Sequence, residues 1–172
     1  KPPNQPPRET ATKPQPETAM PNAQLYRYQP AIVPGPHGHD PRPLGPDGED
    51  YRDTLTELCE LDGWRYVAVP AGITPQIPAA LTTWEAVDLS PALREAVKAA
   101  SPHCQLAKER FVLSIRAKHS LDDELYYARI ATGSLLGTYS LQDGEAAQLA
   151  IYQNDVESAR QRLHEQYAQL GL

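Results

Sequence analysis

The residues that most resemble a metal site in this chain are His37, His39 and Asp40, which lie within four consecutive positions. This spacing lets two imidazoles converge with a carboxylate, and these are ligand types that Zn²⁺ accepts. The cluster lies between Pro36 and Pro41, and no fourth ligand is close to it in the sequence. We therefore interpret it as a chance grouping in a polar loop, and we expect no metal and no cofactor.

Other groups of reactive residues also fall short of a catalytic site. The acidic run at residues 122–124 follows Ser120 and opens an expected helix, where negative side chains favour the helix dipole. The glycines at 133 and 137 are not followed by the Lys-Ser/Thr pair of a phosphate-binding loop. No Cys–His or Ser–His–Asp arrangement can be identified. We predict that the chain is not an enzyme.

The two cysteines, Cys59 and Cys104, both fall on expected helices. Two thiols without a CxxC motif do not form a disulfide framework. We favour the interpretation that each is a small buried apolar residue. Pairing of the two in an oxidising compartment is the alternative that the sequence leaves open.

The elements that must position these residues divide the chain into two parts. Of the 18 prolines, 13 lie in residues 1–50, where large aliphatic residues are scarce. Proline fixes φ and disfavours helix in the preceding residue, and such a segment has too little apolar surface to form a core. We expect residues 1–50 to be an extended proline-rich arm and linker that adds little stability. Residues 51–172 are expected to be a globular domain.

One part of the arm, residues 23–33, is richer in apolar and aromatic side chains. Alternation places Tyr26 and Tyr28 on one side of an extended chain. We predict that Tyr26, Tyr28, Ile32 and Val33 anchor the arm on a neighbouring subunit, in a groove or as an added strand. A flexible tether with incidental tyrosines is the alternative.

The globular part is predicted to be mainly α, with a small α+β fold as the alternative. Asp62-Gly63 indicates a turn, and residues 64–69 and 82–87 are expected to be a short two-stranded β element. Ser-Pro pairs and capping patterns give the helix starts. The helices are expected at residues 51–61, 91–100, 101–118, 120–137 and from 140 to about 170. The helix at 120–137 is expected to direct Leu121, Leu125, Ala128, Thr132 and Leu135 inward.

The last helix has the clearest apolar period in the chain. A 3-4 spacing over about three heptads joins residues that could form a self-association seam. An ordinary amphipathic helix that covers the domain core is the other interpretation. The seam residues are Leu149, Tyr152, Val156, Ala159, Leu163 and Leu170.

Charge and hydropathy restrict the partners. The net charge is −6, which argues against nucleic acid as the main partner. No run of 18 or more apolar residues occurs, so we expect no transmembrane helix and no membrane partner. Other protein subunits, including further copies of this chain, are the expected partners.

Two long segments carry a resemblance to a known class of proteins. Residues 58–70 (LCELDGWRYVAVP) and 87–103 (VDLSPALREAVKAASPH) resemble small virion- or tail-associated structural proteins of tailed bacteriophages. The similarity continues through residues 115–124 (IRAKHSLDDE) to the C-terminal Leu-Gly-Leu, and it does not include the arm. It implies a structural part of a tail, baseplate or tail-fibre attachment, located in the virion after assembly in the host cytoplasm.

Three functions are therefore open from the sequence. The first is a non-enzymatic adaptor whose arm docks on neighbouring virion subunits. The second is a tail-fibre assembly chaperone. The third is a small carbohydrate-binding or enzymatic module with a site near Trp64 and Trp84, since tryptophan rings stack well on sugars.

Overall fold

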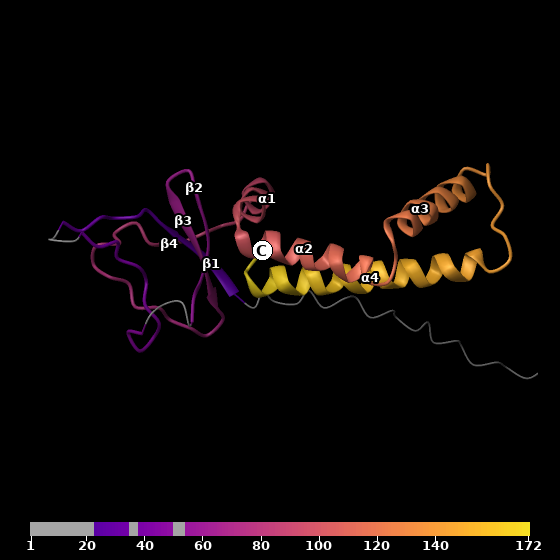
Figure 1. Cartoon of the computed structure of the whole chain (residues 1–172). Coiled ribbons are helices and arrows are strands. Elements are labelled where there is room, and N and C mark those ends of the chain that lie inside the picture. The colour runs from indigo at the N-terminus through magenta and orange to yellow at the C-terminus, as the bar shows by residue number, and fades with distance from the viewer. Residues whose placement is uncertain (1–22, 35–37, 50–53) are drawn as a thin grey trace, which may run out of the picture.

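The computed structural model describes residues 23–34, 38–49 and 54–172, which form an α+β fold. One antiparallel sheet has the strand order β2-β3-β1-β4, and the helices follow it in the sequence. The sheet lies at one end of the molecule, and the last helices of the chain extend away from it (Figure 1). The elements are β1 (Ala23–Tyr28), β2 (Thr56–Leu61), β3 (Trp64–Pro70), β4 (Glu85–Ala86), α1 (Pro91–Ala100), α2 (Pro102–Arg116), α3 (Leu121–Leu135) and α4 (Glu145–Gln169).

The expectation of a mainly α domain with a two-stranded β element is wrong, because the described residues contain a four-stranded sheet. Strand β1 comes from the segment expected to be an arm. It pairs with β3 along its whole length, with Ala23 opposite Pro70 and Tyr28 opposite Arg65. The boundary expected at residue 50 therefore falls between two strands of one sheet.

Strand β1 forms because its side chains alternate and both of its faces are covered. Ala23 and Leu25 point to one face and are 3% and 2% exposed, while Tyr28 points to the other and is fully buried. Aromatic residues favour strands. The sequence around β1 is rich in proline and poor in apolar residues, so it did not predict a strand of the domain. The residues that bury β1 lie far along the chain.

Strand β2 lies within the helix expected at 51–61, of which residues 51–53 are outside the described ones, and a β-bulge explains the error. The pairing with β3 shifts between Glu57 and Cys59, so that Leu58 is an extra residue. Both Leu58 and Cys59 consequently pack in the same core, which gives an i, i+3, i+4 apolar spacing that imitates a helix. Asp62 and Gly63, with φ values of 53° and 76°, form the tight turn to β3.

The sheet has a core on each face. On the helix face, α1 contributes Val97 and the C-terminal residues Leu170 and Leu172 pack nearby. On the loop face, the segment between β3 and β4 supplies Leu81 and Trp84. The buried residues of the helix face are Ala23, Leu25, Leu58, Cys59, Tyr66, Ala68 and Val97, and those of the loop face are Tyr28, Leu55, Val67, Val69 and Leu81.

The helix starts at Ser90, Ser101 and Ser120 agree with the sequence prediction. The Ser90 side chain accepts a hydrogen bond from the backbone of Leu93, and Ser120 and Asp123 form a reciprocal capping box. The longest helix begins later than expected. It starts at Glu145 rather than near Ser140, since Gly144 takes a left-handed conformation at the N-cap.

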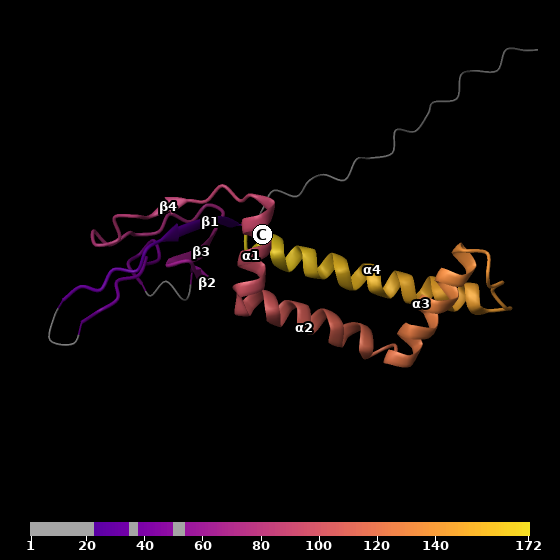
Figure 2. The ribbon, with the colours of Figure 1, turned by 90° about the horizontal axis from the view of Figure 1, so that it is seen from above.

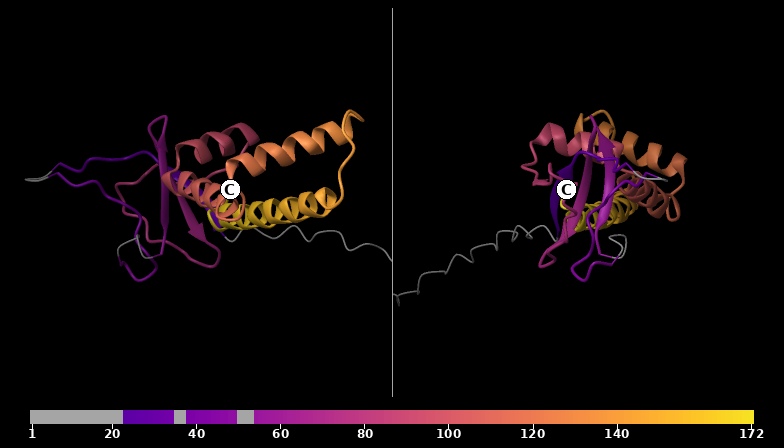
Figure 3. Two further views of the ribbon diagram at one scale, coloured as in Figure 1. Left: turned by 45° about the vertical axis from the view of Figure 1, so that its right-hand side comes forward. Right: turned by 90° about the vertical axis from the view of Figure 1, so that its left-hand side faces the viewer.

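Residues 102–169, here called the helical projection, extend from the sheet as α2, α3 and α4. Helices α2 and α4 pack together through Cys104, Ala107 and Tyr167, and α3 lies at the far end (Figure 2). Figure 3 shows the same arrangement from two further directions. Helix α4 ends in a Schellman motif, in which the amides of Leu172 and Gly171 donate to the carbonyls of Tyr167 and Ala168.

Two neighbouring substitutions in β1 test whether this strand belongs to the core. We expect Leu25→Ala to lower the free energy of unfolding by about 2–5 kcal/mol, because it leaves a cavity in the helix-face core. The exposed neighbour Gln24 is the matched control, and Gln24→Ala should change that free energy by less than about 0.5 kcal/mol. Urea unfolding of both variants measures the difference. Equal stability of the two would contradict the placement of β1.

Candidate interaction surfaces

The two tyrosines predicted to anchor an arm on another subunit lie inside this chain's own fold. Tyr28 is 0% exposed, and burial raises the pKa of its hydroxyl. Tyr26 stacks on Trp84 with ring centroids 4.9 Å apart and planes within 9°. Both rings therefore hold the segment before β4 against the sheet. Docking of Tyr28 on a neighbour would require the loop-face core to open.

The other two predicted anchors follow β1. Ile32 is 80% exposed. Val33 is half-buried and exchanges two backbone hydrogen bonds with His39, at 3.0 and 3.3 Å. Ile32 is thus the one of the four anchors that is open to solvent, and its role in binding stays a prediction.

The two tryptophans do not share a site. Trp84 packs against the loop-face core, and Trp64 packs against the helix-face core on the opposite side of the sheet. The Trp64 ring is covered by the guanidinium carbon of Arg27, 4.3 Å from the ring centroid. Arg27 is in turn held by Glu85, with 2.6 Å between Nη2 and Oε1. A single sugar could not stack on both rings.

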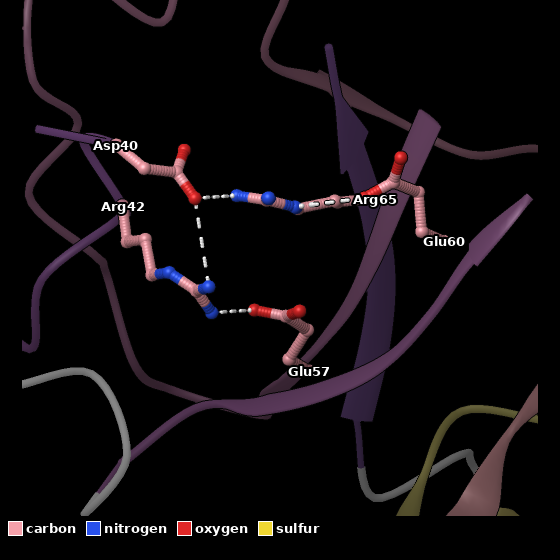
Figure 4. A network of polar contacts seen from close by, with 5 residues as sticks. All are labelled: Asp40, Arg42, Glu57, Glu60 and Arg65. Carbon is pink, nitrogen blue, oxygen red and sulfur yellow. Dashed lines mark hydrogen bonds and ion pairs between the residues drawn. The ribbon is translucent and has the colours of Figure 1, made fainter. Parts of the chain in front are cut away.

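A polar cluster fastens residues 40–42 to the sheet (Figure 4). Arg65 Nη1 lies 2.5 Å from Asp40 Oδ2, and Arg65 Nε lies 3.3 Å from Glu60 Oε2. Arg42 pairs with Glu57 and lies 3.5 Å from Asp40. Burial disfavours the charged form of Arg65 and acts to lower its pKa. The hydrogen bond to Asp40 and the adjacent Tyr28 favour the charged form more strongly, so the pKa of Arg65 is raised. The cluster is a structural clasp in which opposite charges neutralise one another.

Two members of this clasp also line a pocket. Arg42 and Glu57 border a space of about 440 Å³ between β2 and the start of α2, where Pro102 and His103 form another wall. Because the guanidinium and the carboxylate pair with each other, neither presents an uncompensated charge to the pocket.

The metal-like cluster does not gather around one point. Asp40 pairs with arginines, His39 lies in the bridge to Val33, and His37 is outside the described residues. Within residues 23–34, 38–49 and 54–172, no group of three or more metal-ligating side chains is found. In the same ranges, no helix combines the length and apolar character required to cross a membrane.

The two cysteines lie on β2 and α2 and are free thiols. Both are buried, and burial raises the pKa of Cys59 to about 11 and also raises the pKa of Cys104. The interpretation of each as a small buried apolar residue is confirmed. The expectation that both lie on helices is wrong for Cys59, because β2 replaces the first expected helix.

The predicted seam of α4 faces other parts of the same chain. Ala159 is 3% exposed, and Leu163 and Leu170 pack against the buried residues that join α2 to α4. Tyr152 stacks on Tyr127 of α3 at 4.9 Å. The remaining seam residues, Leu149 and Val156, are half-buried. A role for this seam in self-association stays a prediction, since the seam already has intramolecular partners.

Polar contacts hold the first half of α3 and the segments that flank this helix. At its start, His119 Nε2 lies 3.0 Å from Asp155 Oδ2, and Lys118 Nζ lies 2.5 Å from Asp155 Oδ1. These contacts lower the pKa of Asp155. The hydroxyls of Tyr126, in the second turn of α3, and of Tyr139, in the loop after α3, both donate to Glu145 at the start of α4.

The apolar stripe of α3 points outward, so the expectation that it faces the core is wrong. Leu121, Leu125 and Leu135 are 53%, 57% and 87% exposed. Ala128 and Thr132 are exposed as well. We call these five residues the α3 stripe. The stripe faces away from the core because the opposite face of α3, with Tyr127 and Ile130, packs against the rest of the helical projection. Leu113 and Leu136 add further exposed apolar surface nearby in the sequence.

A substitution of Arg65 tests the clasp. We expect Arg65→Ala to lower the free energy of unfolding by about 1–3 kcal/mol, because it leaves partly buried Asp40 without its closest cation. Arg94→Ala is the control, since the Arg94 side chain is exposed and makes no ion pair among the described residues. Chemical denaturation of both variants gives the comparison. A loss in Arg94→Ala as large as in Arg65→Ala would contradict the clasp.

A pH series tests the contact between α3 and α4. Hydrogen bonds from Tyr126, the Gln142 amide and Tyr139 lower the pKa of Glu145. A carboxyl with a lowered pKa stabilises the fold above its unfolded pKa of about 4.3, and this contribution disappears as pH falls through the folded value. Glu145→Gln should therefore lower the melting temperature at pH 7, and its difference from the unaltered chain should shrink toward pH 3.

Circular dichroism at 222 nm follows this transition. Glu109→Gln is the matched control, because Glu109 is an exposed residue of α2 whose side chain has no hydrogen-bond partner in the described part of the chain. A constant difference between the Glu145 variant and the unaltered chain from pH 7 to pH 3 would argue against the contact.

The comparisons with known proteins identify no relative of this chain. No protein-family model, no curated protein and no solved structure matches the chain. The features that bear on function are therefore the surfaces of the chain itself. Among the described residues, exposed apolar side chains gather on the α3 stripe and also on α2, where Leu106, Val112 and Leu113 are exposed.

Proposed function

We propose that this chain is a non-enzymatic structural adaptor in a large protein assembly. The observation that carries the proposal is the α3 stripe, in which three leucines are more than half exposed on one face of one helix. Exposed apolar side chains that gather on one face are typical of protein–protein contact sites. Scattered single leucines would not support the same proposal.

The position of the stripe also suits an adaptor. Helix α3 lies at the end of the helical projection farthest from the sheet (Figures 1 and 2). The contacts of Tyr127 in its first half and of His119 and Tyr139 in the flanking segments hold the helix, while the stripe on its outer face stays exposed. A partner could therefore approach α3 without contacting the sheet.

The resemblance of residues 58–172 to small tail-associated phage proteins supports a more specific proposal. The assembly would be a virion tail, baseplate or tail-fibre attachment, and the partners would be other tail components. This part of the proposal depends on the sequence resemblance alone.

The separation of Trp64 and Trp84 on opposite faces of the sheet weighs against the carbohydrate-binding alternative. A tail-fibre assembly chaperone remains the second candidate, since a chaperone also needs an exposed apolar surface. The two differ in their fate, because an adaptor stays in the finished particle and a chaperone leaves it.

Incorporation into particles tests the proposal. We expect purified virions of the phage that encodes this chain to contain it in a fixed copy number, as measured by quantitative mass spectrometry. Leu135→Glu should reduce incorporation at least tenfold, because it places a charge in the docking face. Ile32→Glu, at the similarly exposed residue predicted to anchor the arm, tests that other docking site and should leave incorporation unchanged if the α3 stripe is the docking face.

Three results would count against this function. Absence of the chain from mature virions, with presence in infected cells, would favour the chaperone. A loss of incorporation with Ile32→Glu and none with Leu135→Glu would move the docking site to the predicted arm. Unchanged incorporation of both variants would remove the α3 stripe and Ile32 as contact sites.

A further inference from the structure

We propose that the α3 stripe binds the α3 stripe of a second copy of this chain, with the two helices antiparallel. The inference rests on the proposed function, and it names a second copy as the partner of the stripe. It assigns self-association to α3 and not to the α4 seam, for which an ordinary amphipathic helix is the other interpretation of the sequence.

The spacing of the stripe is that of a helix-pairing seam. Its five residues follow one another at intervals of four, three, four and three, which is the a/d pattern of two heptads. An α-helix with this pattern presents one narrow apolar seam, and a second helix with the same pattern fills it best. Because a two-fold interface uses the same patch on both copies, a seam of this kind can complement itself.

Antiparallel pairing places large side chains against small ones. With the two helices aligned by alternating a and d layers, Leu125 lies opposite Ala128 of the second copy. Leu121 in the same way lies opposite Thr132 of the second copy. A leucine facing an alanine or a threonine interdigitates without leaving a void, so these four layers fill evenly. Leu135, the fifth residue of the stripe, lies beyond them in this alignment.

The charges beside the seam select the same arrangement. Asp122 and Arg129 flank the seam on one side, and both are exposed. Neither side chain has an ion-pair or hydrogen-bond partner in the part of the chain that the structure describes. In the antiparallel alignment, Asp122 of each copy lies beside Arg129 of the other, which gives two symmetric ion pairs.

A parallel arrangement is less favourable. It would bring the acidic first turns of both α3 helices together, with Asp122 and Asp123 of one copy beside those of the other. Like charges placed face to face at an interface disfavour that arrangement. It would also set leucine against leucine and small residue against small residue along the seam.

A partner would also stabilise helix α3. This helix is 15 residues long, and Ile130, which is 3% exposed, is its one buried residue. Helices of this length are marginal in water without tertiary packing. A second copy would cover the opposite face and supply the packing that the rest of the chain does not.

Sedimentation equilibrium of the full chain over a wide concentration range tests the proposal. We expect a reversible dimer whose dissociation constant rises at least tenfold in Leu125→Glu. Leu106→Glu is the matched control, since Leu106 is a 45% exposed leucine in the first turns of α2, near the sheet. It should dimerise like the unaltered chain. Far-UV circular dichroism shows whether each variant is folded.

Charge reversal tests the antiparallel alignment. Asp122→Arg and Arg129→Asp should each weaken the dimer at least tenfold, because each sets like charges beside one another. The double variant restores opposite charges at both places, and its dissociation constant should return to within about threefold of the original. A parallel dimer would not be rescued in this way, since these two residues would not meet.

Several outcomes would overturn the inference. A chain that is monomeric at every concentration would remove the second copy as the occupant and leave another protein of the assembly. A dimer unaffected by Leu125→Glu would place the contact elsewhere, and a dimer not rescued by the double variant would exclude the antiparallel alignment. If Leu135→Glu still prevented incorporation into particles, the adaptor function would stand without self-association.

Discussion

The fold depends on the pairing of β1 with β3. This antiparallel pair joins residues 23–28 to residues 65–70, and both faces of β1 contribute to a core. Without β1, the edge of β3 would lose its hydrogen bonds, and both faces of the sheet would lose buried side chains. The end of the chain depends on the same strand, since a side chain at Gly171 would come within 2.9 Å of the Ala23 carbonyl oxygen.

The bulge in β2 determines where charge can gather. With Leu58 as an extra residue, two consecutive side chains enter the helix-face core, and Glu57 and Glu60 are left to meet arginines. Exposed ion pairs contribute little to stability. Arg65 differs from these exposed ion pairs because its side chain is only 13% exposed. A buried guanidinium needs a paired carboxylate, and Asp40 provides it. The clasp thereby attaches the proline-rich segment around Asp40 to a sheet that is distant in sequence.

The three helices of the helical projection are held together in two different ways. Helices α2 and α4 pack against each other, whereas α3 is held largely by aromatic and polar contacts from its first half and from the segments that flank it. Such contacts fix the direction of a helix without using its whole apolar surface. The result is a helix with an inward face of moderate burial and an outward face of exposed leucines, which is the physical basis of the proposed docking surface.

Local signals in the sequence determined much of the helical part. Ser90-Pro91, Ser101-Pro102 and the Ser120–Asp123 capping box act within a few residues, so their helix starts could be predicted. The β3 strand and the Gly171 end of α4 were readable for the same reason. Tertiary structure alone decided the sheet, because β1 becomes a strand only when β3 and two distant cores cover it. Tertiary structure also decided that the α3 stripe faces outward. Periodic apolar residues show that a helix has an apolar face, but they do not show what covers that face.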